Sequence, residues 1–344
     1  MSDRPLGTLG ERRRPVRLAR AGGRVLARGF PRGSLARLVA GRFGQALVVA
    51  LVVGLVGFAM MEALPGDAAF RIAAGRYGYD QVSAAAAEAV RAERGLDRPA
   101  IWRLAEWVGQ TLTFDLGRSA VTGAPVTHAV AAQLGHSALL AAAALAIAVA
   151  IALPVGSLSG LRPGGALDRA SEAASVMLRA TPAFLLGVVL MLLLAVELRL
   201  FPAAGHAHAG HLALPALTLG LVLASVLTRV VRDAVLDATT SEAYRFARHK
   251  GLSERDAFLR HGLRSAAVPV VAYLGVQAAL LLEGVVVVES VFAWPGIGHA
   301  LTHAIFERDV AVVQGTALTL GLTFVTISLA VDLACRAIDP RTRA

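Results

Sequence analysis

Six long stretches of the chain lack charged side chains, and this feature constrains the fold more than any other. Each stretch is near the roughly 20 residues that a helix needs to cross a bilayer. Unpaired backbone groups are costly in lipid, and the runs are too long and too uniformly apolar for barrel strands. The sequence therefore predicts an all-α integral membrane protein with six transmembrane helices. They are expected over Phe43–Met61, Ser137–Leu161, Ala180–Val196, Leu212–Thr228, Ser265–Leu282 and Val310–Val331.

The distribution of Lys and Arg predicts the orientation of these helices. With the N-terminus in the cytoplasm, 25 of the 34 basic residues fall in cytoplasmic segments, and the two short external loops carry only Arg199 and Arg308. The other basic residues lie in the long segment between the first two helices, and such segments cross the membrane largely regardless of charge. Both termini are therefore expected in the cytoplasm. The net charge of +10 is spread over many segments instead of one stripe, so no nucleic-acid partner is expected.

The first forty residues are rich in Arg and Gly, and they predict a disordered cytoplasmic tail over residues 1–40. A cleavable signal peptide is the rival interpretation, but the apolar stretch that follows is longer than the 7–15 residues of a signal core. The single cysteine, Cys335, leaves no intramolecular disulfide. Beyond the tail, we expect a transmembrane domain over 41–338, with an external segment over 65–135 and a cytoplasmic loop over 229–265, and a cytoplasmic C-terminus over 339–344.

The external segment reads as folded rather than as a linker. An Ala-rich stretch near Val82–Arg94 predicts a helix, Gly95 a turn, and Pro99 the start of a second helix. We expect these helices to fold over the outer mouth of the protein.

The cytoplasmic loop between the fourth and fifth predicted helices is the most informative segment. It reads as a helix that ends at Lys250, a stop at Gly251, and a second helix for which Ser253 is the N-cap, with Asp256 three residues on. Taken alone, this pattern is more often an ordinary helix–turn–helix between two spans than a functional element. It predicts two short basic helices that project into the cytoplasm.

This loop resembles the one that docks into a groove of the ATPase in permeases of ABC importers, in the longer form of dipeptide, oligopeptide and nickel permeases. The short form of that motif begins Glu-Ala-Ala six residues before the glycine, and here Arg245-Phe246-Ala247 stands in those places, so only the second alanine is kept. Peptide-type members also lack this glutamate and have a proline further from the glycine, as Pro269 is here, so the chain resembles that subclass. The resemblance extends to most of the chain after Ala40. Further matching segments are Leu64–Asp67, Gly95–Pro99, Asp115–Ser119, Leu214–Leu219, Phe292–Gly298, Arg308–Asp309, Val312–Gly315 and Asp339–Arg341.

The resemblance implies a permease subunit in the bacterial inner membrane that forms half of a translocation pathway for short peptides or similar small polar solutes. Its implied partners are a second homologous permease, two ATP-binding subunits, an external solute-binding protein and the lipid bilayer. A nickel or metal-chelate importer is the alternative within the same class. The residues implied to couple the chain to the ATPase are Arg245, Ala247, Lys250, Gly251, Leu252, Ser253, Glu254 and Arg255.

Two acidic residues near the end of the fifth apolar run are candidates for the pathway or its mouth. Glu283 ends the run and Glu289 lies just beyond it. A charge at membrane depth is costly, so by default it faces a water-filled path or a partner. For Glu283, an interfacial position with the carboxylate in external water is equally consistent with the sequence.

His206, His208 and His211 lie close together in the short external loop after the third predicted helix. Imidazoles at this spacing are able to hold a divalent transition metal. His211 fits the resembled family pattern ahead of Leu214-Pro215, which leaves His206 and His208 as additional histidines in an Ala/Gly loop. Such residues more often belong to a solvated turn, so no metal site and no cofactor are expected.

Signatures of catalysis are missing from the sequence. It contains no phosphate-binding glycine loop followed by Lys-Ser/Thr, no His-Glu-x-x-His and no Gly-x-Ser-x-Gly. Any ATP hydrolysis is therefore expected in another chain. An intramembrane enzyme and a membrane scaffold are the rival classes, and co-purification of an ATPase with a sister permease separates both from an importer subunit.

Overall fold

The computed structural model describes residues 35–63, 66–78, 82–95, 97–113, 115–119, 121–284, 286–307 and 309–338. Helices dominate these ranges, which hold one isolated β-bridge, between Arg118 and Pro125. Residues 1–34 of the predicted tail and the predicted C-terminus over 339–344 lie outside the described residues. The prediction of an all-α membrane protein is confirmed.

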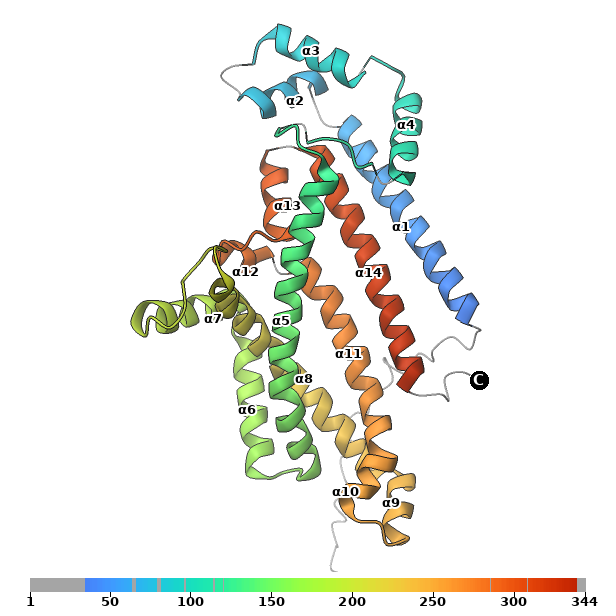
Figure 1. The fold of residues 1–344 in the computed structure, drawn as a ribbon, viewed down its shortest axis with the longest axis vertical. Helices are drawn as coiled ribbons and strands as arrows, with labels where there is room; N and C mark the ends of the chain where they lie inside the picture. Colours follow the sequence, from blue (N-terminus) through green and yellow to red (C-terminus); the bar gives the residue numbers. More distant parts are fainter. Residues whose placement is uncertain are drawn as a thin grey trace, which may run out of the picture.

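Long helices run side by side along the length of the molecule (Figure 1). Within the described ranges, five helices are long and apolar enough to cross a membrane, and a bent pair makes a sixth span if it is counted as one. The bundle has α5 and α8 at its centre, packed along each other, with α11 and α14 beside them and α1 against α14. The bounds are α1 Leu35–Ala63, α5 Val126–Leu161, α8 Ala213–Thr240, α11 Leu263–Gly284 and α14 Val310–Ile338.

Two glycines allow the close approach of α5 and α8. A Cβ added at Gly156 would lie 2.7 Å from the carbonyl oxygen of Thr228, and one at Gly160 would lie 2.6 Å from that of Arg232. Small residues at a helix interface let the backbones approach, which favours association in a membrane. The α5–α8 contact is therefore the rigid centre of the bundle.

The third span is a bent pair of helices. Helix α6 (Ala166–Ala180) is followed by α7 (Ala183–Leu190), which continues as a π-helix over Met191–Glu197, and the segment Ala183–Glu197 lies at an angle of 102° to α6. Pro182 lies at the break, where its ring is compatible with the start of a helix but not with its interior. Pro182 accounts for the break, and the predicted span Ala180–Val196 covers only the part after the bend.

Most helices extend beyond the apolar runs that predict them. Helix α5 begins at Val126 instead of Ser137, and α8 continues to Thr240 instead of Thr228. Helix α1 begins at Leu35, so residues 35–40 are helical and not part of a disordered tail. The reason is that apolar runs report the part of a helix that lies in lipid, whereas the hydrogen-bonded helix continues into water.

The two ends of the bundle carry different elements. Helices α2 (Ala68–Tyr77), α3 (Ala84–Arg94) and α4 (Ala100–Leu112) lie at one end, and α9 and α10 at the opposite end (Figure 1). Following the charge-based orientation, these are named the outer end and the inner end. Gly95 ends α3 at a φ of 57°, and Ser83 caps its start, so the predicted helix, turn and second helix are confirmed. Helix α2 was not predicted.

Candidate coupling loop, outer hairpin and pocket

The loop at the inner end, residues 241–262, is named the corner loop. It contains α9 (Glu242–His249), α10 (Glu254–Ala257) and a π-helical turn over Phe258–Gly262. Ser253 is the N-cap of α10, because its hydroxyl oxygen accepts a hydrogen bond of 3.1 Å from the amide of Asp256. The two short helices and this cap agree with the sequence-based prediction, but only α9 is basic, because α10 carries Glu254 and Asp256 against Arg255.

Gly251 forms the corner between the two helices. Its φ is +88°, in the region that favours glycine, and the space around it is open. Its amide donates to the carbonyl of Arg248 at 3.0 Å, and the amide of Leu252 donates to that of Ala247 at 3.3 Å. Backbone geometry, and not crowding, is therefore the reason for glycine at this position.

Side chains brace the corner from both sides. Arg248 donates to the carbonyl of Leu252 at 2.7 Å and lies 3.6 Å from the carboxylate of Glu254, so it joins the end of α9 to the start of α10. Ala247 and Ala257 are buried beneath the two helices. The corner loop is thus a pair of braced helices and not a flexible connection.

The solvent-facing side of the corner loop presents an aromatic ring among basic residues. Phe246 is 63% exposed, and the ammonium of Lys250 lies 4.4 Å from its ring centroid. Sequence reasoning counted Lys250 but missed Phe246 and Arg248; the spacing of four between Phe246 and Lys250 was the available signal. Of the residues expected to couple, Ala247 is buried and Leu252 partly buried. The exposed ones are Arg245, Lys250, Gly251, Ser253, Glu254 and Arg255.

Polar contacts also connect the helices that adjoin the corner loop to their neighbours in the bundle. Arg264, at the start of α11, donates from Nε to the carbonyl of Ile338 at the end of α14. On α8, Arg229 and Arg232 lie 3.2 and 3.0 Å from the carboxylate of Asp168, which is 4% exposed at the start of α6. These contacts join α11, which follows the corner loop, to α14, and α8, which precedes it, to α6.

The connection between α11 and α14 forms a short hairpin of α12 (Val286–Val291) and α13 (Ile297–Phe306), named the outer hairpin. Glu289 is fully buried in it. Its carboxylate accepts hydrogen bonds from the amides of Gly298 and His299, both at 3.0 Å, and from the hydroxyl of Ser137 on α5. Amides at the start of a helix favour a negative charge, which explains how a carboxylate is held in the interior.

Further contacts attach the outer hairpin to α5. The indole of Trp294 donates to the carbonyl of His136 at 3.1 Å, and the amide of Ile297 donates to the hydroxyl of Ser137 at 2.8 Å. Gly296 is necessary here, because an added Cβ would lie 1.9 Å from a carboxylate oxygen of Glu289. The outer hairpin and α5 therefore form one rigid unit.

The structure buries one of the two acidic pathway candidates. Glu289 is enclosed by hydrogen-bond donors instead of facing a water-filled mouth, because the turn after α12 folds back over it. The side chain of Glu283, at the end of α11, lies outside the side chains that the structure describes. A pathway role for either residue stays a prediction.

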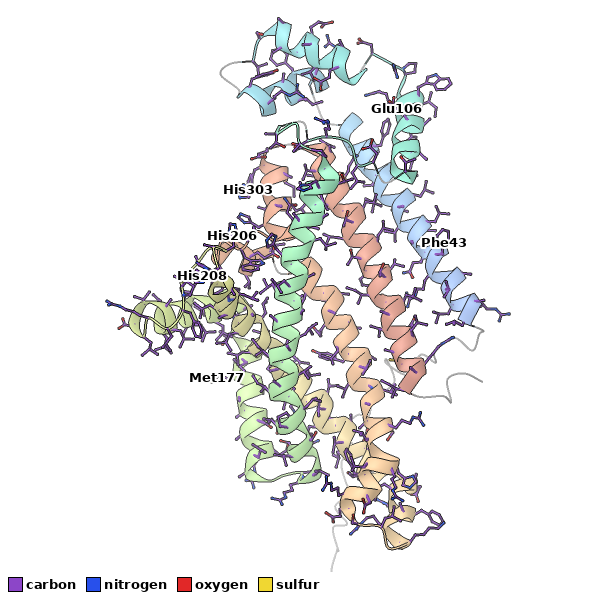
Figure 2. All side chains as sticks on the ribbon, in the orientation of Figure 1. Phe43, Glu106, Met177, His206, His208 and His303 are labelled. Carbon is purple, nitrogen blue, oxygen red and sulfur yellow. The ribbon has the colours of Figure 1, made fainter. Side chains whose placement is uncertain are left out.

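The three loop histidines do not form one cluster. His206 and His208 lie on the loop before α8 (Figure 2). The ring of His206 lies 6.4 Å from that of His136, whereas the rings of His208 and His211 pair with centroids 4.1 Å apart. His208 and His211 act as a reciprocal cap for the short 3₁₀ helix Ala209–Leu212. Across the described ranges, no group of three or more His, Cys, Asp or Glu side chains is arranged to hold a metal.

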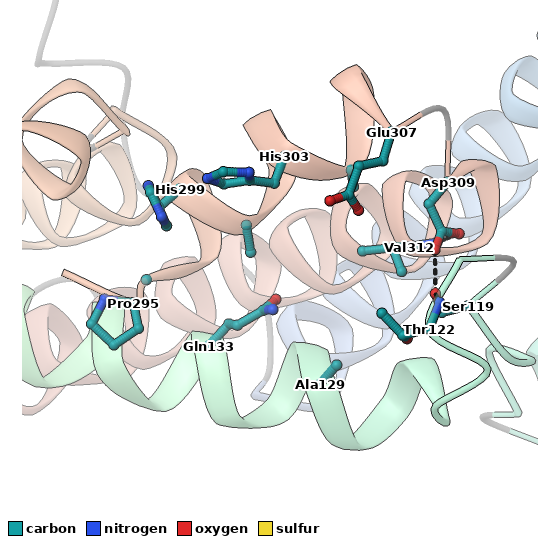
Figure 3. A pocket seen from close by; sticks show the side chains of 13 residues that line it. Ser119, Thr122, Ala129, Gln133, Pro295, His299, His303, Glu307, Asp309 and Val312 are labelled. Carbon is teal, nitrogen blue, oxygen red and sulfur yellow. Dashed lines mark hydrogen bonds between the residues drawn. The ribbon is translucent and has the colours of Figure 1, made fainter. Parts of the chain in front are cut away.

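A pocket of about 290 Å³ opens near the outer end, between α5, the outer hairpin and the start of α14 (Figure 3). Gln133 of α5 points into it from one wall, and His299, His303 and Glu307 face it from the other. These three residues lie four apart, so they share one face of α13. Sequence reasoning missed this pocket, although the spacing of its three residues was a signal.

Part of the pocket lies within a region that known proteins share. Residues 152–344 match the family described as binding-protein-dependent transport system inner membrane component. The chain belongs to this family. The matched part of the permease contains the corner loop and the outer hairpin, and the walls of the pocket that α13 and α14 supply.

Relatives of the permease match over most of its length. The glutathione transport system permease protein GsiC of Pectobacterium atrosepticum is 38% identical over 85% of this chain and 94% of its own. A putative peptide transport system permease protein of Brucella abortus is 35% identical over 89% of this chain and 98% of its own. The GsiC protein of Escherichia coli O6:H1 is 35% identical over 85% of this chain and 94% of its own. The chain is therefore a multi-pass membrane permease of a transport system.

Proposed function

We propose that this chain is a permease subunit of an ATP-driven importer in the bacterial inner membrane, and that it moves short peptides or similar small polar solutes. The transport of glutathione and peptides by named relatives supports this substrate class. In this proposal the chain pairs with a second permease, two ATPase subunits and an external solute-binding protein. The chain itself carries the pathway, and ATP hydrolysis takes place in the ATPase chains.

The proposal rests mainly on the exposed surface of the corner loop. It presents the exposed Phe246 ring within a basic surface, and aromatic and Arg side chains are the usual anchors of protein interfaces. Arg245 and Lys250 flank it on the chain, Arg255 lies on α10, and all three are exposed and suited to acidic side chains on a partner. The loop is thus suited to fill a groove on the ATPase.

The braced geometry explains how the loop would transmit movement. When the ATPases close on ATP, α9 and α10 follow as one body because Arg248 and the buried alanines hold them together. The loop continues into α8 and α11 along the chain, and the Arg264–Ile338 contact and the Asp168 ion pairs pass this movement from α11 to α14 and from α8 to α6. The pathway then reopens on the opposite side of the membrane, as alternating access requires.

Gly251 supplies the test of this proposal. In cells that carry the whole importer, Gly251→Val strains the corner, and uptake of a labelled tripeptide should fall at least tenfold while the chain remains in the membrane. Gly251→Asn is the matched control, because Asn tolerates positive φ and should retain most of the uptake.

Two results of this experiment would count against the proposal. Near-normal uptake by Gly251→Val would remove the coupling role from the corner loop. Uptake of nickel, but of no peptide, by the unmodified importer would replace the peptide substrate with the metal alternative.

A further inference from the structure

The outer pocket presents several hydrogen-bond acceptors, and its lining holds two histidines but no permanently charged basic side chain. Of the thirteen residues that line it, none is Lys or Arg. The oxygen Oε1 of Gln133 is buried and makes no hydrogen bond within the described part of the chain. Native structures leave few buried polar atoms unsatisfied, so this oxygen points to a missing donor.

A carboxylate faces this oxygen from the opposite wall. Glu307, at the end of α13, points into the same space, and no ion pair with it occurs among the described residues (Figure 3). The other lining carboxylate, that of Asp309, is occupied by the hydroxyl of Ser119. Glu307 and Gln133 therefore offer a negative charge and a neutral acceptor to one occupant.

The size and walls of the pocket limit what this occupant is. About 290 Å³ is near the lower end of the range for small-molecule sites and provides room for about one amino-acid residue. Apolar side chains of Ala129, Pro295, Ala300, Ala304 and Val312 make up much of the lining. A small apolar or neutral group that carries a primary ammonium matches both the walls and the two acceptors.

We infer that this pocket binds the N-terminal residue of a peptide, with its α-ammonium between the Glu307 carboxylate and Oε1 of Gln133. The inference rests on the proposed function and deepens it, since it selects peptides that have a free amino terminus. The walls come from the spans α5 and α14 as well as from the outer hairpin, so a bound peptide end lies at the outer entrance of the bundle.

Disulfide trapping in the purified importer complex tests this inference. Ala129→Cys places a thiol in the pocket, and Ala131→Cys places one on an exposed position of the same helix as the matched control. The one native cysteine, Cys335, is buried. The probes are Cys-Ala-Ala and N-acetyl-Cys-Ala-Ala, each activated as a mixed disulfide with thionitrobenzoate, so that the protein thiolate displaces thionitrobenzoate. The ratio of trapping rates at positions 129 and 131 corrects for the different reactivities of the two peptides.

The ratio of the trapping rate at position 129 to that at position 131 should be about tenfold higher for the free-amino peptide than for the acetylated one, as expected for a charge-assisted hydrogen bond. Glu307→Gln should remove this preference, whereas Glu106→Gln, an exposed acidic residue on α4, should leave it unchanged.

Three results would overturn the inference. Equal ratios for the two peptides would show that the ammonium is not recognised. A preference that survives Glu307→Gln would show that the Glu307 carboxylate is not the counter-ion of the ammonium. A preference abolished by EDTA and by His299→Ala would show that the pocket holds a divalent cation through the His299–His303 pair. Uptake of tri-alanine, measured in parallel, tests the proposed function separately: trapping without uptake would reject the importer role and not the specificity of the pocket.

Discussion

Glu289 of α12 accepts a hydrogen bond from the hydroxyl of Ser137 on α5, although 152 residues separate the two along the chain. The same hydroxyl oxygen accepts from the amide of Ile297, so Ser137 links the carboxylate to the start of α13. Both side chains are buried. This relationship fixes the outer hairpin against the central helix.

Removing the hydroxyl should therefore destabilise the protein. Ser137→Ala leaves the amide of Ile297 without its acceptor and the carboxylate of Glu289 with one donor fewer, and we expect a loss of about 1–3 kcal/mol in the free energy of unfolding. Thermal unfolding of the protein in detergent measures this loss of stability as a lower melting temperature. Ser290→Ala is the control, because Ser290 is exposed on the same hairpin and should change the melting temperature little. Equal melting temperatures for Ser137→Ala and the unmodified protein would contradict the structural role of Ser137.

The α5–α8 contact should not tolerate one additional methyl group. In Gly156→Ala the new Cβ meets the backbone of Thr228, which cannot rotate away, so the helices must separate at a cost of about 1–3 kcal/mol. Gly135→Ala on the same helix meets nothing within 4 Å and is the matched control. Comparison of thermal unfolding and yield of the two variants decides the point; the prediction fails if both behave alike.

The predicted orientation can be tested by labelling cysteines in spheroplasts with a membrane-impermeant thiol reagent. Ala87, in the middle of α3, is a poor site because it is 4% exposed, whereas Ala85 on the same helix is exposed. Cysteines at positions 85 and 207 should react from outside. A cysteine at the exposed Thr240, at the end of α8, should react only after the membrane is permeabilised. Reaction of position 240 in intact spheroplasts would invert the orientation.

Phe246 should contribute to ATPase binding without contributing to the stability of the chain. Because its ring is 63% exposed in the isolated subunit, Phe246→Ala should leave thermal unfolding unchanged. It should weaken the binding of the ATPase by about 2 kcal/mol or more in binding free energy, as expected for an aromatic anchor at the centre of an interface, and less ATPase should then co-purify. Glu242→Ala, on the first turn of the same helix, is the control. Unchanged ATPase binding by Phe246→Ala would place the interface elsewhere.

Local patterns in the sequence determined the helices and their turns. Lipid excludes charged side chains and unpaired backbone, so apolar runs alone predicted the spans. Ser253 as a cap, Gly251 as a corner and Pro182 as a break depend on backbone groups within a few residues, and the structure shows each of them. These features need no information about distant parts of the chain.

Only the tertiary structure decided how distant residues meet. The pairing of Ser137 with Glu289 depends on the packing of the outer hairpin against α5. This packing also buries Glu289, which the sequence marked as a candidate for the pathway or its mouth. The pocket likewise brings Gln133 and Glu307 together from helices far apart in the chain. Hydropathy and capping report each residue's own surroundings along the helix, whereas these contacts depend on how the helices pack, which is a property of many side chains at once.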